Sequence, residues 1–163
     1  MKGGFGHELP NVELRKLDFL VGDSCGQGVL CPPGRLPIPF TGYMHVEREQ
    51  CERYLRMDFF GQIPILGTES IHSMITYSEK HLCYRMWSFA ASQEEPMLMR
   101  GDFDGDRLVF VSDPTEMVWG IERMRCAFTY LADGVVDYCA ELWTIDGYQP
   151  YFRATYAMAT VAV

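Results

Sequence analysis

The chain has 163 residues, which suits one domain that buries roughly two-thirds of its unfolded surface without needing a disulfide or a metal. Its formal charge is -8, with three lysines against eleven arginines. This acidic balance excludes a general nucleic-acid binder, which needs a basic surface, and it disfavours attachment to a membrane surface.

The first predicted element is one short helix over residues 11–22. Asn11 is a candidate N-cap, leucines follow at near-helical spacing (positions 14, 17 and 20), and Gly22 ends the segment. Residues 1–10 lack the apolar middle of a signal peptide and are expected to form a flexible arm. We therefore expect a cytoplasmic protein.

Beyond residue 22 the apolar pattern changes to a period of two, which is typical of strands with one buried face. Turn-forming segments such as SEKH, DFDGD and DGYQP separate the apolar stretches. Ten strands are predicted, near residues 23–30, 40–49, 51–60, 68–77, 82–90, 96–102, 107–112, 116–131, 135–145 and 149–161.

The first predicted strand contains three glycines in FLVGDSCGQGVL, although glycine normally weakens strands. Ser24, Gly26 and Gly28 fall on one face. Side chains this small let a strand bend sharply and let its neighbours approach closely. The glycines therefore predict a sheet that curves and closes.

The two faces are clearest in the last three predicted strands. Alternate residues there form largely apolar faces: Met124, Cys126, Phe128 and Tyr130; Val136, Tyr138, Ala140 and Leu142; and Phe152, Ala154, Tyr156 and Met158. Arg153 and Glu141 fall on the opposite faces. If those faces point outward, the two residues form a surface ion pair; if the phase is inverted, they form a buried anchor for a carboxylate or carbonyl group.

A ten-strand meander with one apolar face tends to close, because strand twist and exposed edges disfavour a wide flat sheet. We predict an all-β fold in a single domain over residues 1–163, an up-and-down antiparallel β-barrel of about ten strands with one short N-terminal helix. Ten strands leave room for a cavity unless large side chains fill it.

The links between strands predict which end of the barrel is open. The links after the first and third strands, CPPGRLPIP and GQIPILG, are longer, apolar and rich in proline, whereas the links after even-numbered strands are short and polar. In an up-and-down barrel the two apolar links lie on the same rim. We take that rim as the candidate entrance and place the helix nearer the opposite end.

The order of helix, FLVGDSCGQG, β meander, GDFDGDRLVF turn and late ELWTIDGYQPYFRATYAMA resembles a domain-of-unknown-function family of bacterial lipocalin-like barrels. That family lies in the calycin superfamily and is similar in outline to nitrobindin and fatty-acid-binding proteins. The resemblance spans nearly the whole chain and implies a lipocalin-like barrel with an apolar small-molecule cavity.

The resemblance also implies a first-strand motif Gly-x-Trp-x-Gly-x-Gly. Gly22, Gly26 and Gly28 keep its glycines, but Ser24 stands at the tryptophan position, so a bulky plug at the barrel floor is missing or comes from another residue. Nitrobindin-type haem binding needs a histidine late in the chain. Histidines occur only at positions 7, 45, 72 and 81, and no cofactor is expected.

Patterns that suggest a metal have simpler interpretations. The run of Asp102, Asp104 and Asp106 resembles part of a calcium loop, but Arg107 stands where an EF-hand needs glycine, so a hairpin turn is predicted. The six cysteines form no Cys-x-x-Cys pair and are expected to be reduced. No metal site and no hydrolase or NTPase motif is predicted.

His45 and His72 lie in the second and fourth predicted strands. They could share an interior face as a metal or acid–base pair, although hydrogen-bonded structural histidines are the simpler interpretation.

The candidate ligand-binding residues are methionine, aromatic and leucine side chains in the later strands. They are Tyr84, Met86, Trp87, Met124, Phe128, Tyr138, Leu142, Tyr156 and Met158. The tyrosine hydroxyls are the candidate donors that orient a ligand, because an apolar cavity needs few polar groups to do so. The alternative is that these side chains simply fill the core.

We predict a noncatalytic binder or carrier of an apolar or amphipathic small molecule, with no nucleic-acid or membrane partner. One alternative is a motif-less cyclase or isomerase that holds a polyene or polyketide-like substrate in a reactive conformation, with no catalytic residue assigned. Another is an interaction or scaffold protein with a vestigial cavity, pairing with a copy of itself as a homodimer.

Overall fold

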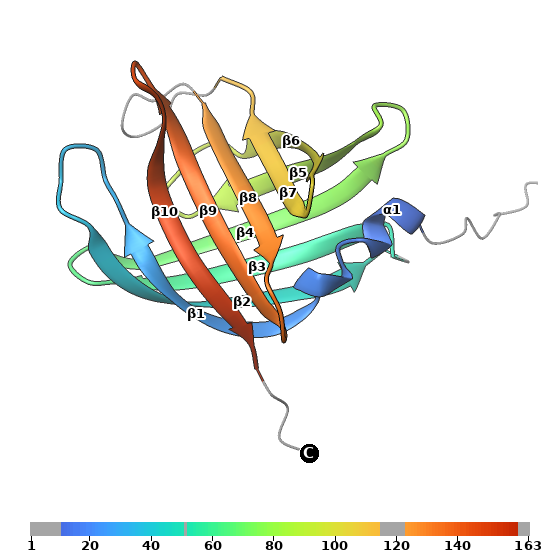
Figure 1. Cartoon of the computed structure of the whole chain (residues 1–163), viewed down its shortest axis with the longest axis horizontal. Coiled ribbons are helices and arrows are strands. Elements are labelled where there is room, and N and C mark those ends of the chain that lie inside the picture. Colours follow the sequence, from blue (N-terminus) through green and yellow to red (C-terminus); the bar gives the residue numbers. More distant parts are fainter. Residues whose placement is uncertain (1–10, 51, 115–122, 160–163) are drawn as a thin grey trace, which may run out of the picture.

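Ten antiparallel strands close into a barrel in the computed structural model of the chain (Figure 1). The structure describes residues 11–50, 52–114 and 123–159. Strands that follow one another in sequence are hydrogen-bonded neighbours, and the first strand pairs with the last to complete the circle. The predicted up-and-down barrel with a short N-terminal helix is confirmed.

The described elements follow the predicted order. They are α1 (Val12–Arg15), a 3-10 helix (Asp18–Leu20), β1 (Gly22–Leu30), β2 (Ile38–Glu49), β3 (Tyr54–Ile63), β4 (Gly67–Ser78), β5 (Cys83–Ala90), β6 (Met97–Asp104), β7 (Arg107–Ser112), β8 (Met124–Tyr130), β9 (Val135–Thr144) and β10 (Gly147–Met158). Within these residues no helix is long and apolar enough to cross a bilayer.

Most strand bounds differ by one to three residues from the expected ones. The third strand begins at Tyr54, because Gln50 and Glu52 have φ values of 50° and 66° and extend the turn before it. The strand predicted over 116–131 is described only at its end, since residues 115–122 lie outside the described residues. The arm predicted for residues 1–10 lies outside them as well.

The N-terminal segment is two short turns instead of the single helix predicted over 11–22. The Asn11 side chain accepts hydrogen bonds from the backbone N–H groups of Glu13 and Leu14 and so caps α1. Leu14, Leu17 and Leu20 are spaced by three residues, the period of a 3-10 helix, so tightening the segment keeps all three on the barrel side. All three are buried.

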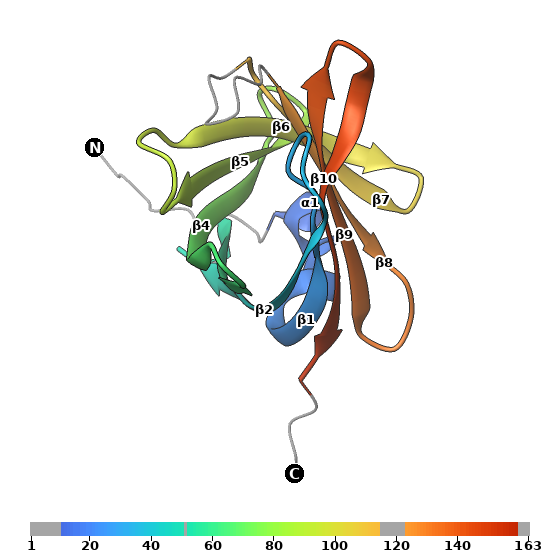
Figure 2. The same cartoon turned by 90° about the vertical axis from the view of Figure 1, so that its left-hand side faces the viewer.

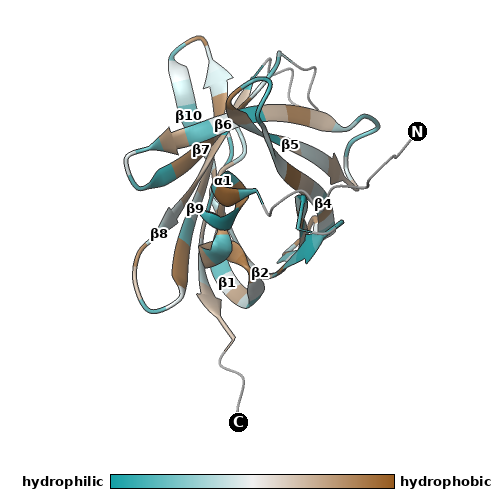
Figure 3. Cartoon of the chain, turned by 90° about the vertical axis from the view of Figure 1, so that its right-hand side faces the viewer, coloured by the Kyte–Doolittle hydropathy of each residue, from teal (hydrophilic) through white to brown (hydrophobic). Residues whose placement is uncertain are grey.

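The N-terminal segment lies across one end of the barrel, opposite the end that carries the β1–β2 link (Figures 1 and 3). Tyr84 Oη donates a hydrogen bond of 2.7 Å to the Glu13 carbonyl, and Asn11 Nδ2 donates one of 3.4 Å to the Tyr77 carbonyl. The Tyr84 ring packs edge-on against Tyr77 and Phe103. The leucines of this segment and Tyr84 therefore fill the end of the barrel that a tryptophan at position 24 would otherwise plug.

The glycines of β1 lie where the barrel wall carries aromatic rings. Gly26 pairs with Tyr156 of β10 on one side and with Gly42 of β2 on the other. A Cβ atom at Gly26 would lie 2.5 Å from the Tyr156 ring, and one at Gly42 would lie 2.8 Å from the Phe59 ring. The close approach predicted from the sequence is confirmed, and it lets large rings lie flat across small residues.

The faces predicted for the last three strands are confirmed. Cys126, Phe128, Ala140 and Tyr156 are buried in the interior, and the alternate residues point outward. Arg153 is accordingly exposed, so the buried-anchor alternative is wrong.

Glu141 does form a surface ion pair, but its partner is Arg125 and not the predicted Arg153. The guanidinium group of Arg125 on β8 donates to Glu141 Oε2 at 2.7 Å and takes the place of Arg153. Arg125 and Glu141 are register partners in β8 and β9, which brings the two side chains together.

The aspartate run forms the hairpin that was predicted. Asp104 and Arg107 are the last register pair between β6 and β7, and Gly105 between them has a φ of 64°. No group of three metal-ligating side chains occurs among the residues that the structure describes. The five cysteines in that part of the chain are free thiols; Cys51 lies outside it.

Candidate ligand-binding cavity

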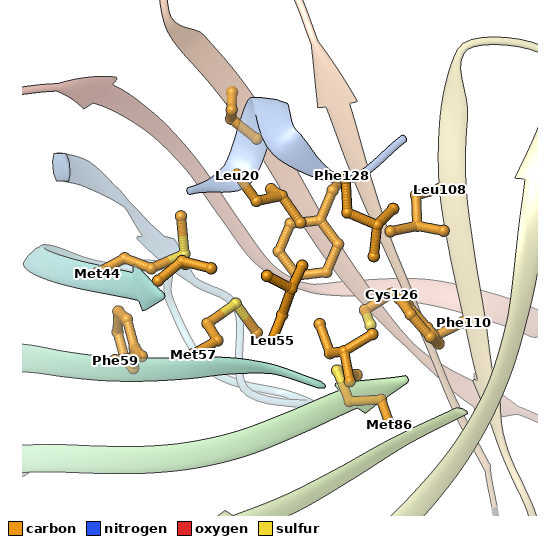
Figure 4. Packing of buried hydrophobic residues seen from close by; sticks show 14 of the residues in the cluster. Leu20, Met44, Leu55, Met57, Phe59, Met86, Leu108, Phe110, Cys126 and Phe128 are labelled. Atoms are coloured by element: carbon orange, nitrogen blue, oxygen red, sulfur yellow. The ribbon is translucent and has the colours of Figure 1, made fainter. Parts of the chain in front are cut away.

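The barrel interior away from α1 contains a cavity of about 360 Å³, within the usual range for small-molecule sites. Five methionines line it from facing walls: Met44, Met57, Met86, Met97 and Met124. Figure 4 shows the side chains of Met44, Met57 and Met86 extending from their strands into the interior. Methionine is flexible and polarisable, so this lining adapts to guests of different shape.

Aromatic rings form the wall on the β1–β3 and β10 side. Phe59 and Phe152 line the cavity with their rings perpendicular and their centroids 6.0 Å apart. Phe40 stacks on Phe152 at 4.2 Å, and Tyr156 meets Phe59 edge-on at 6.4 Å. Because each ring is held by another, this wall keeps its shape.

The cavity reaches the rim that carries the links after odd-numbered strands. Leu66 from the β3–β4 link and Ser92 and Gln93 from the β5–β6 link contribute to its lining. This is the rim predicted as the entrance. Figure 2 views the barrel from the side of the β1–β2 link, with α1 seen beyond the strands.

A second hollow of about 1060 Å³ lies over β1, β2 and β10, where Gln27, Arg153 and Thr155 face outward. It is larger, but it is an open depression on the outside of the barrel. A ligand there would stay largely in contact with water, so the interior cavity is the better candidate site.

Few polar atoms reach the interior cavity. The Ser73 and Ser88 hydroxyls hydrogen bond to each other at 2.8 Å. Tyr156 also lines it, and the Glu69 side chain lies near the mouth with its Oε1 buried. An apolar lining with a small number of placed polar groups is typical of small-molecule sites.

The titratable groups of the deeper wall are neutral at physiological pH. Burial raises the pKa of Tyr138 and of Tyr156, and it raises the pKa of Cys126 to about 12. The Tyr138 hydroxyl is hydrogen bonded to the Cys126 sulfur. The tyrosines are therefore hydrogen-bond donors, and Cys126 is a thiol, not the thiolate that nucleophilic chemistry requires.

The structure gathers five of the nine candidate residues around the cavity. They are Met86, Met124, Phe128, Tyr138 and Tyr156.

The other four candidates lie elsewhere. Tyr84 is part of the plug beneath α1, and Leu142 is buried beside Met124 without lining the cavity. Met158 lies near the end of β10 next to Gly22. Successive strand residues point to opposite faces, so Trp87 lies on the outer face while Met86 points inward. The Arg85 guanidinium lies 5.0 Å from the centroid of the Trp87 ring.

The sequence did not predict the lining residues of β2 to β4, because the inward face of the second to fifth strands could not be assigned from it. In β3 a usable signal exists, because Leu55, Met57 and Phe59 alternate with charged residues, and all three are buried. In β4 both faces mix polar and apolar residues. Ser73 and Glu69 therefore gave no sign of pointing inward.

His45 and His72 share the outer face of the barrel, so the interior pair considered for them is wrong. His45 Nδ1 lies 2.7 Å from Asp23 Oδ1, and His72 Nδ1 lies 2.5 Å from Asp58 Oδ1. Each histidine is the register partner of its aspartate on the neighbouring strand. They are the hydrogen-bonded structural histidines of the simpler interpretation.

Comparison with known proteins supports the fold. No protein-family model and no curated protein matches the sequence. The crystal structure of Rv2717c from M. tuberculosis is similar, with a TM-score of 0.67 over 91% of this chain and 98% of that chain, at 12% sequence identity. At this identity the likeness shows a shared barrel fold, and membership of the lipocalin-like family stays a prediction.

Proposed function

We propose that the protein binds and carries an apolar or amphipathic small molecule inside the barrel. The observation that carries this proposal is a cavity of about 360 Å³ with a mainly apolar lining, in a barrel whose other end is plugged. Such space costs stability, because its lining side chains lack packing partners on one side. A guest molecule restores those contacts.

The chemistry of the wall favours binding over catalysis. Cys126 is a neutral thiol, and the polar groups of the deeper wall are two serines bonded to each other and tyrosines that stay protonated. The lipocalin-like motifs of the sequence support the same function.

Two measurements test the proposal. Protein purified under native conditions is extracted with organic solvent, and the extract is analysed by mass spectrometry for copurified apolar compounds. Extracted and refolded protein is then titrated with N-phenyl-1-naphthylamine, a neutral dye that fluoresces in apolar surroundings. We expect saturable binding at a single site.

A matched pair of variants locates the dye. Ala140→Phe places a ring in the cavity, whereas Ala157→Phe adds the same ring to the outer face of the neighbouring strand. Ala90→Phe does the same as Ala140→Phe nearer the mouth, in case the deeper variant fails to fold. The two cavity variants should abolish dye binding and Ala157→Phe should not. Equal binding by all three folded variants would overturn the proposal.

The catalytic alternative is kept as a second candidate because an ionisable group, Glu69, lines the cavity. A carboxylate is the kind of group that a motif-less cyclase or isomerase needs to move a proton. Incubating any recovered compound with the protein and separating isomers by chromatography tests this. An unchanged compound would eliminate the candidate.

The scaffold alternative now depends on the rim loops alone, because the ten described strands leave no unpaired edge. Leu36, Ile65 and Ile145 are 85%, 99% and 100% exposed in these loops. Sedimentation velocity at several concentrations separates the two ideas. A carrier gives one monomeric species throughout, whereas a homodimer appears as concentration rises.

A further inference from the structure

Glu69 is the one lining residue, among those the structure describes, that carries a carboxyl group. It lies near the start of β4, and its register partner on β3 is Gly61. The inward residues of β4 run from Glu69 through Ile71 and Ser73 to Ile75. The carboxylate therefore belongs to the mouth of the cavity, above an apolar and hydroxyl-bearing wall.

The carboxylate has an unmet hydrogen-bonding need. Glu69 Oε1 is buried and accepts no hydrogen bond from the described part of the chain. Gly61, directly across from it, has no side chain to donate. A buried carboxylate oxygen without a donor is costly, because it has lost its water without replacement.

The cavity offers no positive charge to Glu69. No lysine, arginine or histidine is among the described residues that line it. The arginines of the neighbouring strands serve the outer face instead: Arg56 on β3 pairs with Glu49 and Asp58, and Arg85 on β5 covers Trp87. Cavity binding of an anionic head group would place two negative charges together with no counter-ion.

We propose that the cavity, if it binds a small molecule as proposed above, selects amphipathic molecules whose polar end is a protonated amine or another hydrogen-bond donor. Glu69 holds that end at the mouth, and the apolar body extends inward between Met57, Met86 and Phe152. The deeper hydroxyls of Ser73 and Ser88 hydrogen bond to each other at 2.8 Å, and neither carries a charge that would compete with Glu69 for an amine. Carboxylates such as fatty acids are disfavoured at this site, because a charged hydrogen bond stabilises only the donor-bearing ligand.

A ligand series of equal chain length tests this selectivity. Decylamine, decanol and decanoate are each used to displace N-phenyl-1-naphthylamine from the full-length protein at neutral pH. We expect decylamine to bind most tightly, decanol next, and decanoate about tenfold or more weakly than decylamine. Glu69→Gln should weaken decylamine by about tenfold or more and leave decanol nearly unchanged. Its amide keeps the size of the side chain while removing the charge.

Glu95→Gln is the matched control, since Glu95 is exposed in the β5–β6 link on the same rim. It removes the same charge without touching the cavity, and decylamine affinity should stay as in the parent protein. Decanoate binding as tightly as decylamine would overturn the inference while leaving the carrier proposal intact, and so would equal effects of the two variants. Failure of the dye itself to bind would overturn both.

Discussion

The two ends of this barrel are built from the same strands but have different interiors. At the α1 end the inward positions carry large side chains, and Leu14, Leu17 and Tyr84 are fully buried there. At the other end the same strands enclose a cavity of about 360 Å³. The strand pattern is alike at both ends, so the size of the side chains at inward positions decides where the barrel is solid.

β5 shows this gradient within one strand. Its inward residues run from Tyr84 at the plug through Met86 and Ser88 to Ala90 near the mouth. Side-chain volume falls at nearly every step toward the entrance. A strand of this kind closes one end of a barrel and leaves space at the other, which is the arrangement that a carrier requires.

The largest expected effect is the loss of stability when one buried leucine is truncated at each end of the barrel. Leu108→Ala, at the plugged end, should lower the free energy of unfolding by about 2–5 kcal/mol, because a fully buried leucine leaves a new cavity behind. Leu30→Ala, whose side chain already borders the cavity, should cost clearly less. Urea denaturation measures both. Equal losses would show that the two ends are packed alike.

The next largest effect on stability is expected at Gly42, where the barrel wall packs against the Phe59 ring. Gly42→Ala should destabilise the protein by about 1–3 kcal/mol, because its Cβ would lie 2.8 Å from the Phe59 ring. In a Phe59→Leu background the penalty should shrink, since the ring that meets the new methyl group is gone. The four unfolding free energies form a double-mutant cycle. Strict additivity would contradict this packing.

A matched pair of tyrosines gives a smaller effect. Tyr84→Phe removes the hydrogen bond to the Glu13 carbonyl and should cost about 1 kcal/mol without changing dye affinity. Tyr156→Phe, on the cavity wall, should have little effect on stability, because no described group hydrogen bonds to that hydroxyl. It should weaken binding of ligands that carry an acceptor. Thermal unfolding and dye displacement, measured on both variants, distinguish the two roles.

The smallest expected effect is the pH dependence of stability that comes from Asp23 and His45 on the outer face of the barrel. Hydrogen bonds from Tyr43 and His45 lower the pKa of Asp23, and the hydrogen bond to Asp23 raises the pKa of His45. The His45 contribution to stability is therefore complete below its ordinary pKa of 6.5 and is lost as pH rises through the raised value. The Asp23 contribution is lost as pH falls through its lowered pKa.

Asp23→Asn should lower the pKa of His45, which NMR titration of its ring protons can follow. It should also flatten the dependence of stability on pH between 6.5 and the raised pKa of His45. Exposed pairs of this kind contribute little. Dye affinity should be the same in the variant and the parent. A change in dye affinity would mean that the outer face and the cavity are coupled.

Period-two alternation was sufficient to predict the ten strands and the closed barrel. The cavity reaches the rim that link lengths predict as its entrance. The inward faces of the last three strands could be predicted because apolar and polar residues alternate there, as Cys126 and Phe128 do with Arg125. The cavity could not be outlined because β4 places Glu69 and Ser73 inward and Met74 outward, and these three positions depart from the hydrophobic alternation. Trp87 was misassigned for a related reason, since both faces of β5 are rich in large side chains.

The central claim is that one end of the barrel is hollow and receives an apolar guest. Methyl-labelled methionine offers the most direct test, because some methionines line the cavity, whereas Met99 is buried away from it and Met74 lies on the outer face. When N-phenyl-1-naphthylamine is added, the methyl resonances of Met57, Met86 and Met124 should shift with the dye, and those of Met74 and Met99 should not. Shifts confined to Met74, or spread evenly over all five methyl groups, would contradict a guest held inside the barrel.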